Sequence, residues 1–228
     1  MSKINKKVAV LFSGGKDSCL ALHKAKLEGY DICYLLSIIP DNLDSFMFHK
    51  PCLNLLKKQA EMLGLSDKLI IKESKGIQNK ELLDLKGLIE QVKDKIEVIV
   101  VGGIASSYQG SRIKKICDEL GLEVYAPLYN CKGEEIWEEL LDKGFKVVLT
   151  KISCEGIDKG FLGKIIDDKM LLKLKKLSEK YKFRIDFEGG EAESAVVFMP
   201  GFKKEIKIKF DIINEGEYRH FLDISEVE

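Results

Sequence analysis

The residues best suited to chemistry form one short run, Ser13-Gly14-Gly15-Lys16-Asp17-Ser18. Two adjacent glycines let the backbone turn its N–H groups into one concavity, and the start of a following helix adds partial positive charge. The hydroxyls of Ser13 and Ser18 and the Lys16 ammonium add hydrogen-bond donors and a full charge. This combination predicts a loop that binds an anion.

The spacing of this run excludes a Walker A loop, which requires Gly-x-x-x-x-Gly-Lys-Ser/Thr. Val10 stands where the first glycine of that motif would fall. The loop is therefore not built for ordinary γ-phosphoryl transfer.

The segments around the loop are those that a phosphate-binding turn requires. Before it, the five apolar residues Val8–Phe12 suit a strand buried on both faces, and after it a helical pattern begins. Apolar runs then alternate with helical patterns, with expected strands at 32–39, 68–72, 98–101 and 123–126 and expected helices at 51–63, from 79 onward, and at 111–120. This alternation predicts an α/β fold with a doubly wound, five-stranded parallel sheet of Rossmann-like type.

Ligands of such sheets bind beyond the carboxyl ends of the strands, where the strand order reverses. Three segments lie at carboxyl ends and should converge on one crevice: Ser13–Ser18, Ser37–Pro40 and Gly102–Gln109. The third offers hydroxyl and amide groups to ribose, phosphate or an acyl group. It is also compatible with a polar strand-to-helix loop in which Ser106 or Ser107 is an N-cap.

The pattern changes after Pro127, where we expect a smaller α+β domain. The expected elements are helices at 134–143 and from 167 or 168 to 181, strands at 145–151 and 195–199, and an antiparallel hairpin of 204–210 and 218–224. The predicted boundary near Cys131 divides the chain into residues 1–130 and 131–228.

A second run with chemical capacity is Glu188-Gly189-Gly190-Glu191-Ala192-Glu193-Ser194, which places three carboxylates around a double glycine. Such a cluster could hold Mg2+, orient an amine or take a proton from it. A glutamate-rich turn can also be ordinary solvated surface. The apolar run that follows, Ala195–Met199, would anchor the loop to a strand.

Composition narrows the class of protein. With 37 basic and 37 acidic residues the formal net charge is zero, which argues against attachment to nucleic acid or membrane as the main activity. No apolar run approaches the roughly 18 residues of a membrane span and no apolar leader precedes the first strand, so we expect a cytoplasmic protein. Six cysteines without a Cys-x-x-Cys pair indicate neither a zinc ribbon nor a disulfide framework.

The first loop resembles the PP-loop signature of the N-type ATP pyrophosphatases, which split ATP between its α and β phosphates. Within that group the chain resembles the diphthine-ammonia ligase family in four further motifs: Met47-Phe48-His49, Gly102–Gln109, Pro127-Leu128-Tyr129 and Glu188–Ser194. The resemblance runs along essentially the whole chain, in order. Gly103, Tyr129 and Ser194 depart from the commoner alanine, tryptophan and threonine, and Ser194 keeps the hydroxyl.

The resemblance implies an AMP-forming ligase that uses ATP and Mg2+. It would adenylate the carboxylate of diphthine, a modified histidine of translation elongation factor 2, and replace AMP with ammonia to give diphthamide. The smaller C-terminal domain would bind this substrate and close over the active site. We expect no membrane or nucleic-acid partner, and the sequence leaves the oligomeric state open, a homo-oligomer included.

The resemblance also implies roles for individual residues. Lys16, Asp17 and Glu191 would be catalytic, and Lys16 and Asp17 are expected on a solvent-facing loop; Asp17 would orient the loop or help to place Mg2+. The nucleotide would contact the phosphate loop, backbone groups of the second strand and the double glycine: Ser13, Gly14, Gly15, Lys16, Asp17, Ser18, Ser37, Ile38, Ile39, Gly102 and Gly103. The acceptor, with its cationic trimethylammonium group, or the incoming ammonia would contact Ser106, Ser107, Tyr108, Gln109, Glu188, Glu191 and Glu193.

Two alternatives stay open. Another PP-loop enzyme could act on a different carboxylate or on tRNA, against which stand the missing Cys-x-x-Cys and the lack of basic excess. A nucleotide sensor of the universal-stress type could use the same fold without catalysis, against which stand the intact Lys16 and Asp17. The cysteines lack the surroundings of a glutamine amidotransferase nucleophile, so we expect free ammonia as the nitrogen source.

Overall fold

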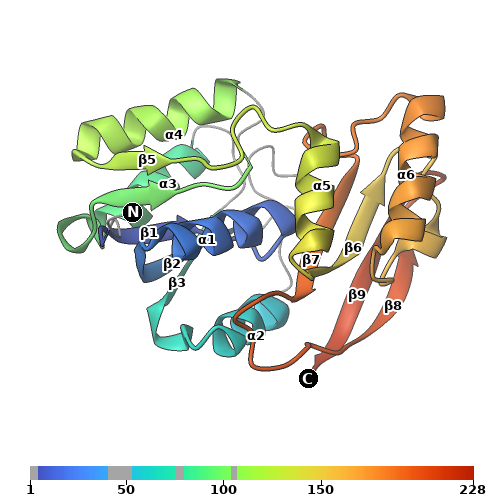
Figure 1. Cartoon of the computed structure of the whole chain (residues 1–228), viewed down its shortest axis with the longest axis horizontal. Helices are drawn as coiled ribbons and strands as arrows, with labels where there is room; N and C mark the ends of the chain where they lie inside the picture. Colours follow the sequence, from blue (N-terminus) through green and yellow to red (C-terminus); the bar gives the residue numbers. More distant parts are fainter. Residues whose placement is uncertain (1–4, 41–52, 75–79, 104–106) are drawn as a thin grey trace. The chain divides into compact units, whose positions relative to one another are not determined.

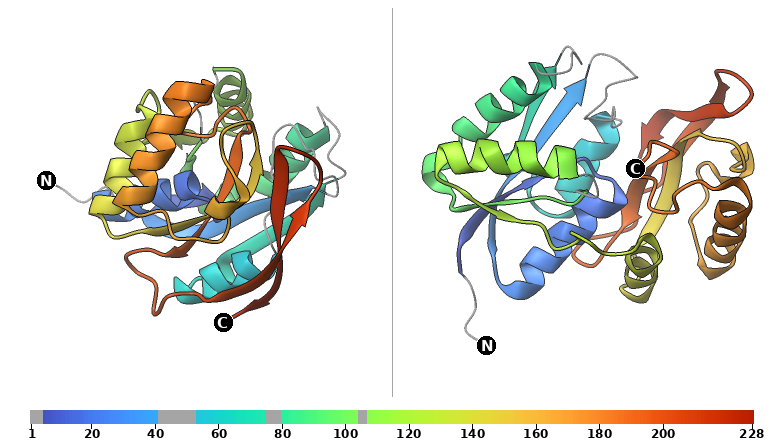
Figure 2. Two further views of the ribbon diagram at one scale, coloured as in Figure 1. Left: turned by 90° about the vertical axis from the view of Figure 1, so that its right-hand side faces the viewer. Right: turned by 90° about the horizontal axis from the view of Figure 1, so that it is seen from above.

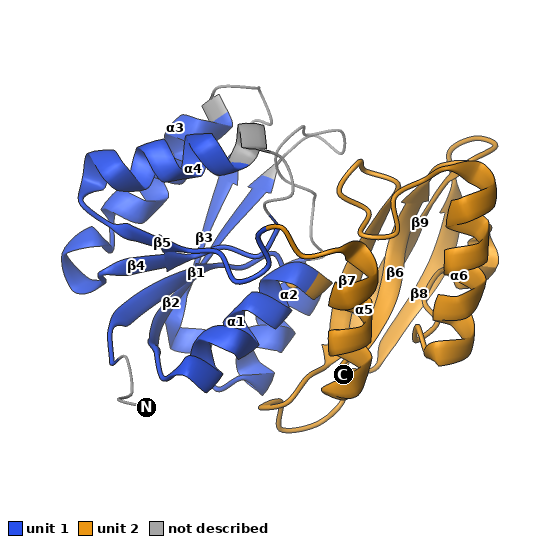
Figure 3. Cartoon of the chain, turned by 45° about the horizontal axis from the view of Figure 1, so that its top comes forward, with its two compact units in different colours: residues 1–13, 17–129 blue, residues 14–16, 130–228 orange. Residues whose placement is uncertain are grey.

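The computed structural model describes residues 5–40, 53–74, 80–103 and 107–228, and the structural statements below concern these residues. The chain forms two compact units (Figure 3). Unit 1 comprises residues 1–13 and 17–129, and unit 2 comprises residues 14–16 and 130–228. Three residues of the first loop, Gly14–Lys16, therefore group with the C-terminal half of the chain.

Unit 1 is built on a five-stranded parallel sheet with the order β3-β2-β1-β4-β5 (Figure 1). The strands are β1 (Lys7–Leu11), β2 (Asp31–Pro40), β3 (Leu69–Ser74), β4 (Val98–Val100) and β5 (Glu123–Tyr125). The predicted α/β class and the five parallel strands are confirmed. The order reverses beside β1, so the first loop stands at the topological switch point of the sheet.

Helices cover both faces of this sheet: α1 (Lys16–Glu28), α2 (Leu53–Met62), α3 (Lys80–Glu90) and α4 (Ser107–Leu120). Helices α3 and α4 lie on one face and α1 and α2 on the other (Figure 3), as right-handed crossovers require. Ala9 and Ile99 of the strands pack with Leu88 of α3 and Cys117 of α4 in one fully buried cluster. Burial on both faces explains why the strands read as continuous apolar runs.

Unit 2 contains a four-stranded antiparallel sheet with the order β7-β6-β9-β8. Its elements are α5 (Gly133–Asp142), β6 (Lys146–Ser153), α6 (Asp168–Tyr181), β7 (Ala192–Phe198), β8 (Ile208–Asn214) and β9 (Arg219–Val227). Helices α5 and α6 lie side by side on one face of the sheet (Figures 1 and 2), joined by an ion pair of 2.8 Å between Glu138 and Lys175. Asp167 caps α6 by accepting a hydrogen bond from the Met170 N–H, which decides between the two starts, 167 and 168, that the sequence left open. The smaller α+β part is therefore also confirmed.

Several boundaries differ from the sequence-based expectation: β7 begins at Ala192 and not at residue 195, and β9 ends at Val227 and not at residue 224. Strand β8 begins at Ile208 and not at residue 204, because the Ile206 N–H donates to the Val197 carbonyl of β7 and the Ile206 side chain is buried. Helix α4 begins at Ser107 and not at residue 111. The expected loop 102–109 was therefore wrong in its last three residues. In the part of the chain that the structure describes, no helix combines the length and the apolar character that crossing a bilayer requires.

Candidate active site

The first loop turns at the end of β1 in the way its glycines allow. Gly14 has a φ of 76°, which lies in the left-handed region that glycine adopts without steric cost. The Ser13 and Ser18 hydroxyl oxygens lie 3.1 Å apart, and the Ser13 N–H donates to the Ser18 Oγ over 3.3 Å. The loop thus brings its two hydroxyls together at the N-terminus of α1, where the partial positive charge of the helix favours an anion.

The end of β4 approaches this loop so closely that only glycine fits. A Cβ on Gly102 would lie 2.5 Å from both the Asp17 carbonyl carbon and the Ser18 nitrogen. Gly102 therefore has a packing reason besides any contact with a ligand. Among the other residues predicted at this edge, Ser106 lies outside the described residues, and Ser107, Tyr108 and Gln109 form the first turn of α4.

The second strand presents alternating backbone groups at the same sheet edge. The Leu36 carbonyl accepts a hydrogen bond from the Phe12 N–H just after β1. Alternate residues of a strand direct their N–H and C=O groups to the same side. Ile38 stands two residues after Leu36, so its N–H and C=O groups also face the side of β1, at a point beyond the last residue of that strand. Ser37 and Ile39 direct theirs toward β3, with which they pair, and the Ser37 hydroxyl donates to the Phe12 carbonyl. Of the three predicted adenine contacts, Ile38 is the one whose backbone is suitably directed.

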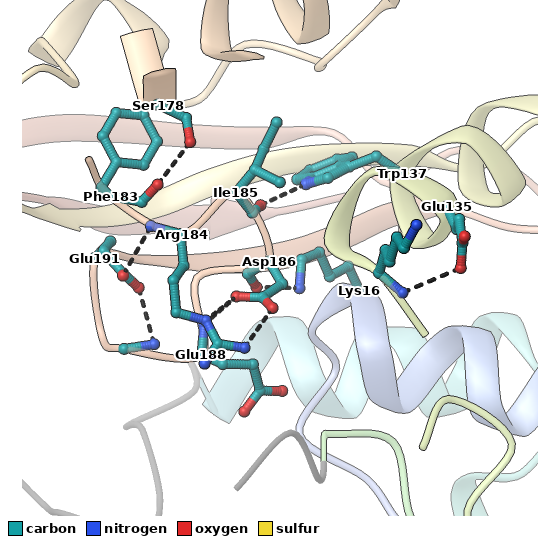
Figure 4. Close-up of polar contacts among 12 residues, drawn as sticks. Lys16, Glu135, Trp137, Ser178, Phe183, Arg184, Ile185, Asp186, Glu188 and Glu191 are labelled. Atoms are coloured by element: carbon teal, nitrogen blue, oxygen red, sulfur yellow. Dashed lines mark hydrogen bonds and ion pairs between the residues drawn. The ribbon is translucent and has the colours of Figure 1, made fainter. Parts of the chain in front are cut away.

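Lys16 is buried, which contradicts the expected solvent-facing position. Its side chain is 2% exposed, and its Nζ donates to the main-chain carbonyl of Asp186 over 2.6 Å (Figure 4). The same Nζ lies 5.9 Å from the ring centroids of Trp137 and Phe187. Sequence reasoning failed here because the partners follow 121 and more residues later in the chain.

The backbone of the same three loop residues is also bonded within unit 2. The Val196 N–H of strand β7 donates to the Gly14 carbonyl over 3.0 Å. The Lys16 N–H donates to the Ser194 Oγ over 3.2 Å. Because β7 is an edge strand of its sheet, these contacts give polar groups of the edge a partner. They explain why Gly14–Lys16 group with unit 2.

The Asp186 carbonyl, which accepts the hydrogen bond from Lys16, belongs to the loop Arg184–Glu191. Hydrogen bonds made by side chains of the loop itself fix its conformation. The Asp186 carboxylate accepts hydrogen bonds from the Arg184 Nε over 2.9 Å, from a terminal Arg184 nitrogen over 2.6 Å and from the Glu188 N–H over 3.1 Å (Figure 4). Burial by itself would raise the pKa of Asp186, but these donors and the charge of Lys16 outweigh it and lower that pKa below its ordinary value. Asp186 is therefore ionised throughout the neutral range.

The three predicted glutamates have different surroundings. The Glu191 carboxylate accepts hydrogen bonds from the Arg184 N–H over 3.1 Å and the Gly189 N–H over 2.9 Å, so it closes the loop. Glu193 forms an ion pair of 3.0 Å with Lys151 on the neighbouring strand. The Glu188 carboxylate points away from the Arg184–Asp186 pair (Figure 4). The structure thus gives Glu191 and Glu193 bonding roles that the sequence did not suggest.

Three of the described cysteines, Cys19, Cys117 and Cys154, are not poised as nucleophiles. Burial raises the pKa of Cys117 to about 11, and burial together with the Glu191 charge raises the pKa of Cys154 to about 11. Burial also raises the pKa of Cys19. A thiol with such a pKa carries almost no thiolate at neutral pH. Within the described ranges, no three His, Cys, Asp or Glu side chains gather as a metal site would require.

Four residues around Lys16 were missed by sequence reasoning: Trp137, Arg184, Asp186 and Phe187. One signal was available, because Trp137 is the single tryptophan of the chain and stands on an amphipathic helix. Phe187 has a φ of 63°, in the left-handed region, and no sequence pattern predicts this conformation for a non-glycine residue.

Comparison with known proteins gives matches along both halves of the chain. The family model described as "Diphthamide synthase N-terminal domain" matches residues 6–124, and "Diphthamide synthase C-terminal domain" matches residues 132–227. A Danio rerio protein named diphthine--ammonia ligase is 34% identical over 221 residues, which cover 89% of this chain and 86% of that protein. A Mus musculus protein of the same name is 30% identical over 222 residues, covering 89% and 82%.

Among solved structures, one described as a predicted subunit of tRNA methyltransferase from Methanocaldococcus jannaschii matches with a TM-score of 0.45 and 19% identity. The match covers 87% of this chain and 99% of that one. Similarity at this level supports no conclusion about this chain.

Proposed function

The chain belongs to the diphthamide synthase family, as its motifs predicted, and from this premise we propose that it is an ATP-dependent, AMP-forming ligase that converts diphthine to diphthamide. The acceptor would be the diphthine carboxylate of translation elongation factor 2, and the nitrogen donor would be free ammonia. A glutamine-hydrolysing site needs a thiolate, and the raised pKa values of Cys117 and Cys154 argue against either thiol in that role. We place the reaction in the cytoplasm.

The observation that carries this proposal is the first loop at the switch point of the sheet. ATP would be a substrate there, with its phosphates at the Ser13 and Ser18 hydroxyls and at the Gly14 and Gly15 N–H groups, and with adenine at the backbone of Ile38. These groups fit a polyphosphate, because the hydroxyls lie 3.1 Å apart at a helix N-terminus. Lys16 would stabilise the negative charge that develops on the leaving pyrophosphate.

The reaction needs two displacements that balance. A carboxylate oxygen of diphthine would attack the α-phosphorus of ATP while the bond to the bridging oxygen of pyrophosphate breaks. Ammonia would then attack the activated carbonyl, form the C–N bond, lose a proton and expel AMP. Mg2+ would be held by the ATP phosphates, by water and by one or two carboxylates, and Asp17 would be the nearest such carboxylate in sequence.

The second unit would serve the acceptor. The trimethylammonium group of diphthine carries a fixed positive charge, and the Glu188–Glu193 segment supplies carboxylates. We assign the first contact to Glu188, because its carboxylate points away from the Arg184–Asp186 pair (Figure 4). The residues Ser106, Ser107, Tyr108 and Gln109 would complete the acceptor side, residues 1–130 would form the nucleotide domain, and residues 131–228 the substrate domain.

The decisive experiment combines the purified protein with elongation factor 2 that carries diphthine, with ATP, and with either ammonium or glutamine. Amidation is followed by mass spectrometry of the modified histidine and AMP by chromatography. We expect amide and AMP in equal amounts with ammonium and none with glutamine alone. AMP without amide would point to a different acceptor, and bound ATP without AMP would point to a nucleotide sensor. Glu188→Gln should weaken acceptor use and leave ATP affinity unchanged, with Glu134→Gln on α5 as the control.

A further inference from the structure

The surroundings of the Lys16 ammonium form a small cradle, which we define as the Asp186 carbonyl and the rings of Trp137 and Phe187. The ammonium is buried, so its charge needs compensation from fixed groups. The carbonyl accepts its hydrogen bond over 2.6 Å, and both ring centroids lie 5.9 Å away, within reach of a cation–π attraction. None of these three residues belongs to the motifs by which the family resemblance was drawn.

The cradle is itself held in place by hydrogen bonds. The Trp137 indole N–H donates to the Ile185 carbonyl over 2.8 Å, next to the carbonyl that receives Lys16. The Arg184 guanidinium and the Asp186 carboxylate form a two-point pair with bonds of 2.9 and 2.6 Å. Trp137 and Phe187 meet edge to face, with ring centroids 6.0 Å apart. The direction of the Asp186 carbonyl is therefore fixed on both sides (Figure 4).

Resting on the proposed function, we infer that Asp186 and Trp137 are positioning residues that fix the Lys16 ammonium for AMP formation. A side chain as flexible as lysine has many rotamers, and a preorganised charge stabilises a transition state far better than a mobile one. The contacts of Asp186 and Trp137 described above are with Lys16 and with the loop that accepts its hydrogen bond. The two residues act through Lys16, and the loop that carries Glu188 thereby contacts both the catalytic lysine and the acceptor.

The first test measures the cradle without any enzymatic reaction. Reductive methylation with formaldehyde and a hydride donor labels exposed lysines, and peptide mass spectrometry gives the rate at each position. In the wild-type protein Lys16 should react roughly tenfold or more slowly than Lys176, an exposed lysine of the same unit, because it reacts only after local opening. In Asp186→Asn the rate at Lys16 should rise severalfold while that at Lys176 stays constant. Equal rates at both lysines in the wild type would overturn the inference.

The second test measures AMP formation in a double-mutant cycle. Asp186→Asn should lower kcat by about tenfold and change the KM for ATP by less than about twofold, since it displaces a charge used in the transition state. In a Lys16→Met background the same change should have almost no further effect, because its route of action is gone. A further loss as large as in the wild type would mean a merely structural role and would refute the inference.

Two more variants are needed, a smaller change in the cradle and a control elsewhere in the same unit. Trp137→Phe keeps an aromatic ring beside Lys16 and removes the N–H that donates to the Ile185 carbonyl. Its kcat should fall as in Asp186→Asn, and because the substitution is small, the test remains possible where larger substitutions prevent folding. Glu215→Gln breaks an ion pair of 2.8 Å with Arg219 at the turn between β8 and β9, and should leave both readouts unchanged. If the wild type makes no AMP, the proposed function and the catalytic part of this inference fail together. Slow labelling of Lys16 would still support the cradle.

Discussion

Gly102→Ala tests the packing that forms the nucleotide edge of the sheet. The added Cβ would lie 2.5 Å from the Asp17 carbonyl carbon and from the Ser18 nitrogen, and 2.6 Å from the Asp17 oxygen. Ordinary contacts between such atoms are about 3.5–4.0 Å, so the backbones must separate by roughly 1 Å. All three atoms belong to main chain, and no flexible side chain can yield. The loop Ser13–Ser18 must therefore move with the first turn of α1.

The cost can be bounded from similar changes. Overpacking of this kind destabilises by about 1–3 kcal/mol, which for a chain of this size lowers the melting temperature by about 2–12 °C. We also expect the affinity for ATP to fall by tenfold or more, roughly 1.4 kcal/mol, because the hydroxyls of Ser13 and Ser18 are displaced together. Differential scanning calorimetry and isothermal titration calorimetry measure the two effects.

Gly87→Ala provides the matched control for Gly102→Ala. Gly87 lies within α3, where a Cβ would meet only the flexible end of Lys72 at 3.2 Å. Replacing glycine by alanine in a helix should stabilise by about 0.5–1 kcal/mol. The two substitutions are chemically identical and should have opposite signs. If Gly102→Ala melts and binds ATP like the wild type, the close approach of β4 to α1 is not present in the protein.

Three further predictions concern the second unit. Glu191→Gln replaces one carboxylate oxygen, which accepts a hydrogen bond, by an NH2 group that faces a backbone N–H; it should lower the free energy of unfolding by about 1–2 kcal/mol and speed hydrogen exchange at the Arg184 and Gly189 amides. Unchanged exchange at these amides would refute the role of Glu191 in closing the loop. Lys151→Met removes the ion pair with the Glu193 carboxylate, whose side chain is 15% exposed, and should lower the free energy of unfolding in urea by about 1–3 kcal/mol. Adding Glu193→Gln to this variant should recover part of that free energy. The pKa of Cys154 is raised from 9.0 to about 11, so at pH 8 this thiol should react with iodoacetamide about 100-fold more slowly than an ordinary thiol. The reaction rate should rise until the pH passes 11, and a plateau near pH 9 would contradict the burial argument.

The sequence determined the local structure around the phosphate loop. Apolar runs of strand length alternate with amphipathic helical segments, and this periodicity depends only on neighbours a few residues apart. The same holds for the turn at Gly14, for the helix that begins at residue 167 or 168 and for the hairpin of β8 and β9. The Ser13–Ser18 motif and its place at a carboxyl strand end could be predicted for this reason, as could the family.

Only the tertiary structure decided where the charged side chains of the site point. Lys16 donates to a carbonyl 170 residues later in the chain, and its N–H meets Ser194, 178 residues later. Glu191 and Glu193 look equivalent in sequence, yet one bonds to backbone N–H groups of its own loop and the other to Lys151 across a strand pair. A buried charge takes whichever partners the packing brings near, because leaving it unpaired costs several kcal/mol. Sequence periodicity carries no information about those partners, since they come from elements whose mutual arrangement is fixed only when the chain has folded.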